Sequence, residues 1–579
     1  MSKIKKLFGL LLAIMMLASI MTACQKEQAT PASDQIQEAT QPAETAAAEE
    51  AVVEEKPGIG PDMLLLPTME NMGDKFPGSW DNYGLIGRMM LFSRVLRLDA
   101  KLQPTKGDLA ESWTVSDDGL HYEFIFKDGI TWHDGVEFTP NDVAISILTA
   151  LKCGQVNAVM KGALSKILGA AEYIADETKM PKDGIEGIKV DGNKLTIDMA
   201  TASGTFLLTM GQFNIFPAHI IGEYDLETIK SMNTSSYYDW PIGTGPYKLV
   251  EFVPNDYALF EYYEDYFGYE EAPSILKVKM QQMTQSDYAV NALADNIDFF
   301  HINDLGTALA ALENPNYEAF YTDIYFVRFF HWNAHAPNDP ISDIRVRRAI
   351  VKAIDRQALI DSLMPNQATV TNTKVPASFD YYNPDVYDLS YDPVAAKALL
   401  DEAGYDYDAE VKLVCYYADQ GSANFMDAVC NYLSQVGIKA SWRLITGDIT
   451  AQLWGDQVDY NMAYAGLSAM AVEEAYNIYE SATLASGVQS GVLPEGFTGM
   501  DDLIHELWTC VDQTRRVEIL KQMQVVESEQ CLWYMPMFAL RNIQVVNTAR
   551  VNLPSDLVLS NEWSNYERYL DQWTLNPAE

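Results

Sequence analysis

Residues 109–142 read LAESWTVSDDGLHYEFIFKDGITWHDGVEFTPND, and this stretch contains three local structural signals in succession. Large apolar side chains alternate along residues 122–126, as they do in a strand with one buried face. Residues 132–135 end in Gly135, which can adopt positive φ and so predicts a tight turn. Thr139, Pro140 and Asp142 then predict a capped helix that begins at Pro140. The stretch therefore predicts a fold that combines strands with helices.

The sequence on both sides continues this mixture of elements. The predicted elements are a hairpin at 188–197, a glycine turn at 241–247 that enters a strand, and helices at 345–363 and 393–403. Ser342 or Asp343 is the expected cap of the helix at 345–363. A chain of 579 residues is too long for one hydrophobic core, so we expect two or three α/β domains.

Taken in order, these patterns resemble the signature of family 5 of the bacterial extracytoplasmic solute-binding proteins. That family includes the oligopeptide-, dipeptide- and nickel-binding receptors of ABC importers. Its pattern runs LAESW, SDDG, an aromatic strand, G-[VI]-x-[WF]-H-D-G and F-T-x-x-D-V, and these parts appear here in the same order. One departure is Lys127, where the family usually has Arg. Three later blocks match as well: GTGPY at 243–247 with DYFG at 265–268, IRVRRA at 344–349 with AIDR at 353–356, and YDP at 391–393 with LLDEAGY at 399–405.

The resemblance implies an α/β, periplasmic-binding-protein-like clamshell of two lobes with an extra third domain. The implied division is lobe I at 58–95, 238–322 and 541–579, the extra domain at 96–237, and lobe II at 323–540. Such a receptor binds a solute between lobes that close, and it then docks on an ABC permease with its ATPase subunits. No reaction takes place on the receptor, and neither a cofactor nor a metal is implied.

The first 57 residues read as an export signal and a tether. Lys3, Lys5 and Lys6 precede an apolar run at 7–20, which at about 14 residues is shorter than the roughly 20 that span a bilayer. Residues 21–24, Met-Thr-Ala-Cys, resemble a bacterial lipobox, which implies that Cys24 is lipidated after removal of residues 1–23. Residues 24–57 are polar and lack aromatic side chains, so we expect a flexible linker. The predicted location is extracytoplasmic, with an N-terminal lipid anchor to the cell membrane.

Charge and cysteine usage exclude several classes of partner and site. Forty basic against 81 acidic residues give a net charge of −41, which repels phosphate backbones, so we expect no nucleic-acid partner. We expect a monomer that meets the membrane through its lipid alone. Apart from Cys24, the five cysteines are scattered and odd in number, which favours free thiols. The seven histidines form no HExxH pattern, and no GxSxG motif is present, so neither a metal site nor a catalytic site is predicted.

The resemblance also suggests where a ligand would bind. Peptide-binding members hold the ligand's α-amino group with an Asp in a G-W-x-x-D segment, but here Leu467 and Met470 stand at the Trp and Asp positions. Glu473 or Glu474 replaces the missing carboxylate, or the ligand is a neutral solute such as an oligosaccharide. The candidate ligand-binding residues are Trp80, Trp332, Asn333, Trp454, Tyr464, Ser468, Met470, Glu473 and Glu474.

The predicted function is therefore solute capture for an ABC importer, with a peptide as the favoured ligand. Two alternatives stay open at this point. One is a receptor of the same fold for an oligosaccharide or another neutral solute, and the other is a surface sensor or chaperone that is not coupled to transport.

Overall fold

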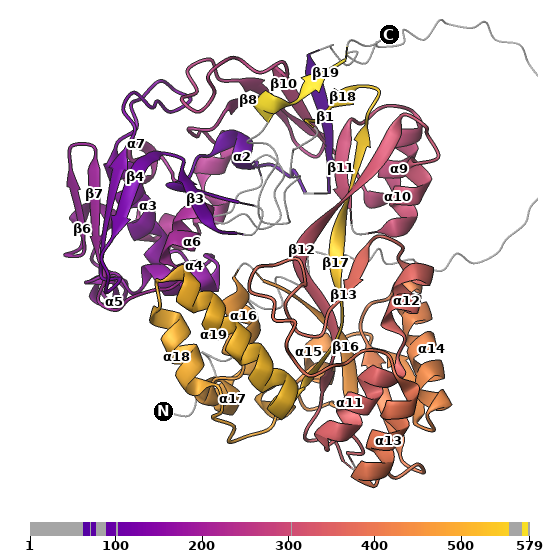
Figure 1. Ribbon diagram of the computed structural model, residues 1–579. Helices are drawn as coiled ribbons and strands as arrows, with labels where there is room; N and C mark the ends of the chain where they lie inside the picture. The colour runs from indigo at the N-terminus through magenta and orange to yellow at the C-terminus, as the bar shows by residue number, and fades with distance from the viewer. Residues whose placement is uncertain are drawn as a thin grey trace, which may run out of the picture.

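The computed structural model describes residues 62–69, 71–76, 88–99, 102–302, 304–337, 339–469, 471–554 and 570–576. Figure 1 shows three bodies, each with helices and sheets, and two long strands, β12 and β17, that run between two of them. We keep the names lobe I, extra domain and lobe II for the ranges expected from the sequence, and the borders themselves remain a prediction. The signal peptide and linker expected at 1–57, with Cys24, lie outside the described residues.

Lobe I is built on a four-stranded sheet at the top of Figure 1. Its order is β1 (Met63–Thr68), β10 (Lys277–Gln282), β9 (Tyr257–Tyr262) and β8 (Tyr247–Val253). The pair β1–β10 is parallel and the other pairs are antiparallel. The other elements of this lobe are α2 (Arg88–Leu91), α9 (Gln285–Leu293), β11 (Phe299–Ile302), α10 (Leu305–Ala311), β18 (Val551–Asn552) and β19 (Thr574–Leu575).

The extra domain is an antiparallel sheet with helices on it, and it lies at the left of Figure 1. The sheet order is β4 (Ala110–Val115), β5 (His121–Phe126), β7 (Lys194–Asp198) and β6 (Ile188–Asp191), and a separate hairpin pairs β2 (Leu96–Leu98) with β3 (Pro104–Gly107). Its helices are α3 (Pro140–Lys152), α4 (Ala158–Leu164), α5 (Ala170–Ala175), α6 (Phe206–Gln212), α7 (Ala218–Ile221) and α8 (Leu226–Lys230).

The strand, turn and helix predicted from residues 109–142 are all confirmed. Strand β5 contains residues 122–126, and Gly135 has φ of 84° in the predicted turn. Helix α3 begins at Pro140 after Thr139, whose backbone N–H donates to the Asp142 carboxylate at 2.7 Å. The predicted hairpin is β6–β7, with Gly192 at φ of 60°.

Lobe II contains most of a seven-stranded sheet at the bottom of Figure 1. The order is β11, β17 (Tyr534–Asn547), β12 (Tyr317–Trp332), β16 (Met462–Ser468), β14 (Glu410–Cys415) and β15 (Lys439–Leu444), and β13 (Ala368–Val370) pairs with β17. Its helices are α11 (Ile344–Ala353), α12 (Arg356–Leu363), α13 (Pro393–Ala403), α14 (Gln420–Gln435), α15 (Ile449–Leu453), α16 (Val472–Asn477), α17 (Ser481–Ser486), α18 (Asp501–Thr509) and α19 (Gln513–Val526).

The long strands β12 and β17 connect the two lobes. They pair antiparallel along most of their length, and β12 carries a register shift between Asp323 and Val327, near the expected border of lobe II. Such a bulge bends a strand locally. Arg541 on β17 forms an ion pair with Asp323 at 2.7 Å beside this shift. The chain therefore passes between the lobes at a defined bend in a continuous two-stranded ribbon.

The buried apolar residues separate lobe II from the other bodies. One cluster contains side chains of both lobe I and the extra domain, such as Leu66, Tyr247, Phe124 and Trp132. A second cluster, whose buried members run from Tyr325 to Ala539, lies within lobe II, and a smaller third cluster lies under α9 and α10. The extra domain thus shares a core with lobe I, whereas lobe II has a core of its own.

Candidate functional site

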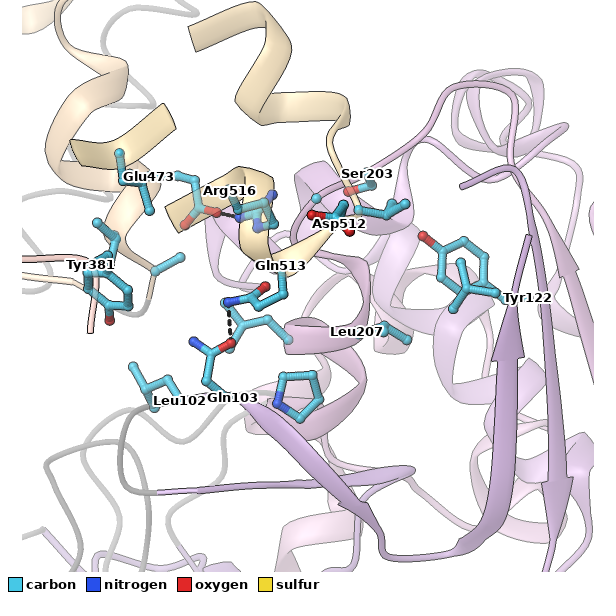
Figure 2. Close-up of a pocket in the computed structure, with 18 of the residues that line it drawn as sticks. Leu102, Gln103, Tyr122, Ser203, Leu207, Tyr381, Glu473, Asp512, Gln513 and Arg516 are labelled. Carbon is cyan, nitrogen blue, oxygen red and sulfur yellow. Dashed lines mark hydrogen bonds and ion pairs between the residues drawn. The ribbon is translucent and has the colours of Figure 1, made fainter. Parts of the chain in front are cut away.

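A cavity of about 350 Å³ lies between the extra domain and lobe II. Figure 2 shows side chains entering it from both bodies. Its lining from the extra domain is Leu102, Gln103, Pro104, Val115, Ser116, Asp117, Tyr122, Ser203, Gly204, Leu207 and Leu208. Its lining from lobe II is Tyr325, Tyr381, Ala469, Ala471, Val472, Glu473, Val511, Asp512, Gln513, Arg516 and Leu520. This volume is at the lower end of the range of about 300–1,000 Å³ typical of small-molecule sites.

The position of the cavity follows from the topology of lobe II. Strands β14, β15 and β16 are parallel, and ligands of such sheets bind beyond the carboxyl ends of the strands. Strand β16 ends at Ser468, and four residues that follow it, Ala469, Ala471, Val472 and Glu473, form part of the cavity wall. The sequence therefore directs this segment to the side of lobe II that faces the extra domain.

A buried ion pair between Arg516 and Glu473 forms one wall of the cavity. Both side chains are less than a tenth exposed, so removal of either one would leave an uncompensated buried charge and destabilise the fold. The Arg516 Nη1 also donates to the carbonyls of Leu507 at 3.0 Å and Cys510 at 2.8 Å. Burial lowers the pKa of Arg516 to about 10, which leaves the guanidinium protonated at neutral pH. The dashed line between these residues in Figure 2 marks the pair.

Gly204 of the extra domain packs directly against this guanidinium. A Cβ atom at Gly204 would lie 1.8 Å from the Nη1 of Arg516, so only glycine fits in the present arrangement. The backbone N–H of Gly204 donates to the carbonyl of Trp508 at 3.0 Å, and the amine of Lys166 donates to the same carbonyl at 3.1 Å. Gln513 donates to Gln103 across the cavity. The two bodies thus meet through a few polar contacts around an unfilled space.

Two neighbouring candidates from the sequence, Trp332 and Asn333, are packed into lobe II. Trp332 is 7% exposed, its Nε1 donates to Asp339 at 2.8 Å, and its ring lies under the guanidinium of Arg347. Asn333 is buried, and its amide donates to the carbonyl of Tyr460 at 2.8 Å. Neither residue lines the cavity.

The next three candidates, Trp454, Tyr464 and Ser468, do not line the cavity either. Trp454 is half-buried against the core of lobe II, and its Nε1 is buried without a hydrogen-bond partner among the described residues. Tyr464 is buried, with its ring stacked on Phe425. Ser468 ends β16 directly before the cavity wall begins. Ligand contact by these residues remains a prediction.

The two candidate glutamates are placed differently. Glu473 lines the cavity, but its carboxylate is paired with Arg516. Glu474 lies in the first turn of α16, where it accepts a 3.4 Å bond from the N–H of Ala471. The candidates Trp80 and Met470 lie outside the described residues.

Several lining residues were absent from the sequence-based candidates. Ser203, Gly204, Asp117, Asp512 and Arg516 come from loops and from the start of α19, in three segments of the chain, the last of which lies about 300 residues after the second. No local pattern links them, and only the chain's folding brings them together. The predicted segment after β16 was the one signal that pointed to this cavity.

The cysteines, histidines and carboxylates of the described residues form no metal centre. Within the described ranges no three His, Cys, Asp or Glu side chains are grouped so that they could hold a metal ion. The five described cysteines are all free thiols: Cys153, Cys415, Cys430, Cys510 and Cys531. Among the helices that the structure describes, none has the length and apolar character needed to cross a membrane.

Comparison with known proteins agrees with this architecture. The Escherichia coli K12 dipeptide-binding protein is 23% identical over 471 residues, which cover 76% of this chain and 82% of that protein. Heme-binding protein A of Haemophilus influenzae is 24% identical over 450 residues, 73% of this chain and 77% of that protein. The crystal structure of the ABC transporter substrate-binding protein CtaP from Listeria monocytogenes has the same fold. Its TM-score is 0.73 at 18% identity, with 89% of this chain and 99% of that chain covered.

The family model of the bacterial extracellular solute-binding proteins, family 5, matches residues 105–488. That match includes the whole extra-domain signature, the strand β12 and the cavity segment after β16. The structure has the two-lobed fold with an extra domain that the sequence predicted. The chain therefore belongs to family 5 of the bacterial extracellular solute-binding proteins, a family of ABC-transporter receptors rather than enzymes.

Proposed function

We propose that the protein is the substrate-binding lipoprotein of an ABC importer, and that it captures peptides and delivers them to a membrane permease. The observation that carries the proposal is the cavity whose walls come from two separately cored bodies, the extra domain and lobe II. The similarity to a dipeptide-binding protein supports a peptide as the ligand. The cavity-lining residues, Glu473 among them, are the proposed contacts.

Capture would follow from closure around the ligand. The ribbon of β12 and β17 would act as the hinge, because it is the continuous connection that passes between the lobes and it is bent at a register shift. A ligand that touches both cavity walls binds the closed form more tightly than the open form, and it therefore shifts the population toward closure. The permease would then recognise the closed receptor.

The importer role also includes a lipid anchor at Cys24. Replacing the thiol removes the group that would receive the lipid, so Cys24→Ala should move the protein from the membrane fraction to the soluble fraction of secreting cells. Continued anchoring of this variant would contradict the lipobox interpretation.

The ligand class can be tested by thermal unfolding of the purified protein with panels of peptides, oligosaccharides and metal chelates. A ligand at 100 times its dissociation constant stabilises the bound state by about 2.7 kcal/mol, which raises the unfolding midpoint by a few degrees. A shift with peptides supports the proposal. A shift with oligosaccharides and none with peptides would replace the peptide by a neutral solute.

A further inference from the structure

We infer that the cavity between the extra domain and lobe II binds a positively charged group that is carried on an apolar body, with Asp117 and Asp512 as its carboxylate partners and Ser203 as a hydrogen-bonding contact. This inference rests on the proposed function, because it names the chemistry of the ligand at that same cavity. The shared chemistry is a cation, which either a peptide's terminal ammonium or a basic side chain can supply.

The charge balance of the cavity wall favours a cation. The lining contains three carboxylates, Asp117, Glu473 and Asp512, and one guanidinium, Arg516. Arg516 already bonds to Glu473 and to the carbonyls of Leu507 and Cys510, so it has little capacity left for an anionic ligand. The whole chain has a net charge of −41, and its field also attracts cations.

Two of the three carboxylates have no cationic partner. Asp117 and Asp512 are exposed at the cavity, and in the described part of the chain neither forms an ion pair. The amine of Lys166 lies near this interface, but it donates to the carbonyls of Ala202 and Trp508 and does not line the cavity. The two carboxylates are therefore available to a ligand.

Asp117 and Asp512 lie on segments that touch each other across the interface. A Cβ atom at Gly119 would lie 2.7 Å from Cγ1 of Val511, so the turn that carries Asp117 packs against the residue before Asp512. One carboxylate comes from the extra domain and the other from lobe II, and a single cation between them would hold the two bodies together. This gives the ligand a direct role in closure.

A buried hydroxyl gives independent support for a ligand at this place. Ser203 is 2% exposed and lines the cavity, and its Oγ is buried without a hydrogen-bond partner among the described residues. Leaving such a group unpaired costs about 1–3 kcal/mol, so a ligand atom that bonds to it gains that energy. Figure 2 labels Ser203 and Asp512 among the side chains that line the cavity.

The rest of the wall supplies an apolar surface. Leu102, Leu207, Leu208 and Leu520 line the cavity together with Tyr325 and Tyr381. These side chains cannot pair with a charge, and they gain free energy by covering an aliphatic or aromatic group. The preferred ligand therefore has both parts, a cationic group near Asp117 and Asp512 and an apolar group beside the leucines.

The test uses the intact protein and two kinds of probe. The first is a library of random tetrapeptides in three forms. One form has free amino termini, the second is N-acetylated, and the third is N-acetylated and also lacks Lys, Arg and His. Native mass spectrometry measures the retained peptides. The second is hexylammonium chloride against the uncharged N-hexylacetamide, measured by the unfolding midpoint. The variants are Asp117→Asn with Asp512→Asn, and Ser203→Ala.

The variants are chosen so that the fold is preserved. Asp512 caps α19 by accepting from the N–H of Arg515, and an asparagine caps equally well. Among the described residues the Asp117 carboxylate accepts no hydrogen bond that the substitution would remove, unlike that of its neighbour Asp118, which accepts from Ser116 at 2.6 Å. Asp191→Asn is the matched control, because Asp191 is an exposed carboxylate of the extra domain outside the cavity.

The inference predicts that the native protein binds hexylammonium and not N-hexylacetamide, and that it retains about tenfold more cationic than uncharged peptide. The double Asp→Asn variant should lose about tenfold in affinity, Ser203→Ala less, and Asp191→Asn nothing. Loss of binding on N-acetylation alone identifies a terminal ammonium, whereas loss only in the library without basic residues identifies a basic side chain. Equal binding of charged and uncharged probes, or an unaffected double variant, overturns the inference. Hexylammonium binding without retention of any peptide would instead refute the peptide function alone.

Discussion

The extra domain contacts lobe I and lobe II in two different ways. Toward lobe I it shares a continuous apolar core, and His133 accepts from the N–H of Gly243 at 3.1 Å while its other ring nitrogen lies 2.9 Å from the carbonyl of Gly245. Toward lobe II the cores stay separate, and the contact consists of a cavity, a few polar bonds around Gly204 and the packing of the turn at Gly119 against Val511. From this difference we expect the extra domain to move with lobe I as one body and to close against lobe II.

The same substitution at the two contacts should therefore have different consequences. Gly243 and Gly204 both lack positive φ, so alanine suits the backbone at either position and only the surroundings differ. At Gly243 the added atom meets fixed backbone within the shared core, whereas at Gly204 it meets a lobe that can withdraw. The following four predictions run from the largest expected effect to the smallest.

The largest effect is expected for Gly243→Ala. Its Cβ atom would lie 1.7 Å from the carbonyl oxygen of Leu91, which is backbone of α2 and cannot rotate away. Overpacking of this kind costs about 3 kcal/mol of unfolding free energy, measured by urea denaturation. Gly162→Ala is the control, because a Cβ there meets nothing within 4 Å. Equal stability of the Gly243 variant and this control would show that the joint to lobe I is not rigid.

The second prediction concerns the pH dependence of the joint to lobe I. Burial lowers the pKa of His133 to about 4, whereas an unfolded histidine titrates near 6.5. The folded state thus binds fewer protons, so the stability supplied by neutral His133 is complete above about pH 6.5 and is lost as the pH falls toward 4. A neutral ring also matches the geometry, because one nitrogen must accept from Gly243.

His133→Asn should therefore cost about 2 kcal/mol at pH 7, roughly two lost hydrogen bonds, and less at pH 5. Urea denaturation at the two pH values measures the gap between the native protein and the variant. His331, whose pKa is also lowered to about 4 by burial, is present in both proteins and cancels in the comparison. A gap that stays constant with pH would contradict the prediction. Ligand affinity should not change, because His133 does not line the cavity.

The third prediction concerns the contact with lobe II. In Gly204→Ala the new Cβ atom would lie 1.8 Å from Nη1 of Arg516 and less than 3 Å from the carbonyl oxygens of Leu507 and Cys510. All three atoms belong to lobe II, so the clash is relieved by opening and stability should be unchanged. Closure would cost about 1–3 kcal/mol more, which corresponds to a loss of ligand affinity of about five- to 150-fold. Small-angle scattering should show less compaction on ligand addition, and native-like compaction would refute the closing contact.

Local sequence patterns predicted the parts of this comparison that depend on short segments. The turn around His133, the glycine turn at 243–245 and the start of α3 were all identifiable, because glycine, proline and capping residues act within a few positions. The predicted helix at 345–363 is instead two helices, α11 and α12, separated at Ile354 and Asp355. Apolar residues recur at helical spacing in both helices, so the spacing alone does not reveal the break. The break is stabilised by Arg356, which donates to the carbonyls of Thr371, Leu389 and Pro536.

The residues that line the cavity were harder to predict from the sequence than the joint with lobe I, and the reason is physical. Aromatic side chains serve both cores and ligand sites, and the composition does not separate the two uses. Trp332 is occupied by Asp339 and Arg347, a pairing that depends on tertiary structure. Likewise Glu473 was a candidate to replace the missing ligand-binding carboxylate, but its partner Arg516 lies 43 residues further along the chain and comes close only in the folded lobe. Local patterns thus predicted the joint with lobe I better than the closing contact with lobe II.

The smallest effect is expected for Lys166→Met, which also tests whether the closing contact acts as a unit. The methionine keeps the length of the side chain but removes the bond from Nζ to the carbonyl of Trp508 at 3.1 Å. A bond of this kind contributes about 0.5–1 kcal/mol, so affinity should fall about two- to fivefold with stability unchanged. In the double variant with Gly204→Ala the interface is already held open, and Lys166 no longer reaches Trp508. The two losses should therefore be less than additive in isothermal titration, whereas full additivity would mean that the two residues act on closure independently.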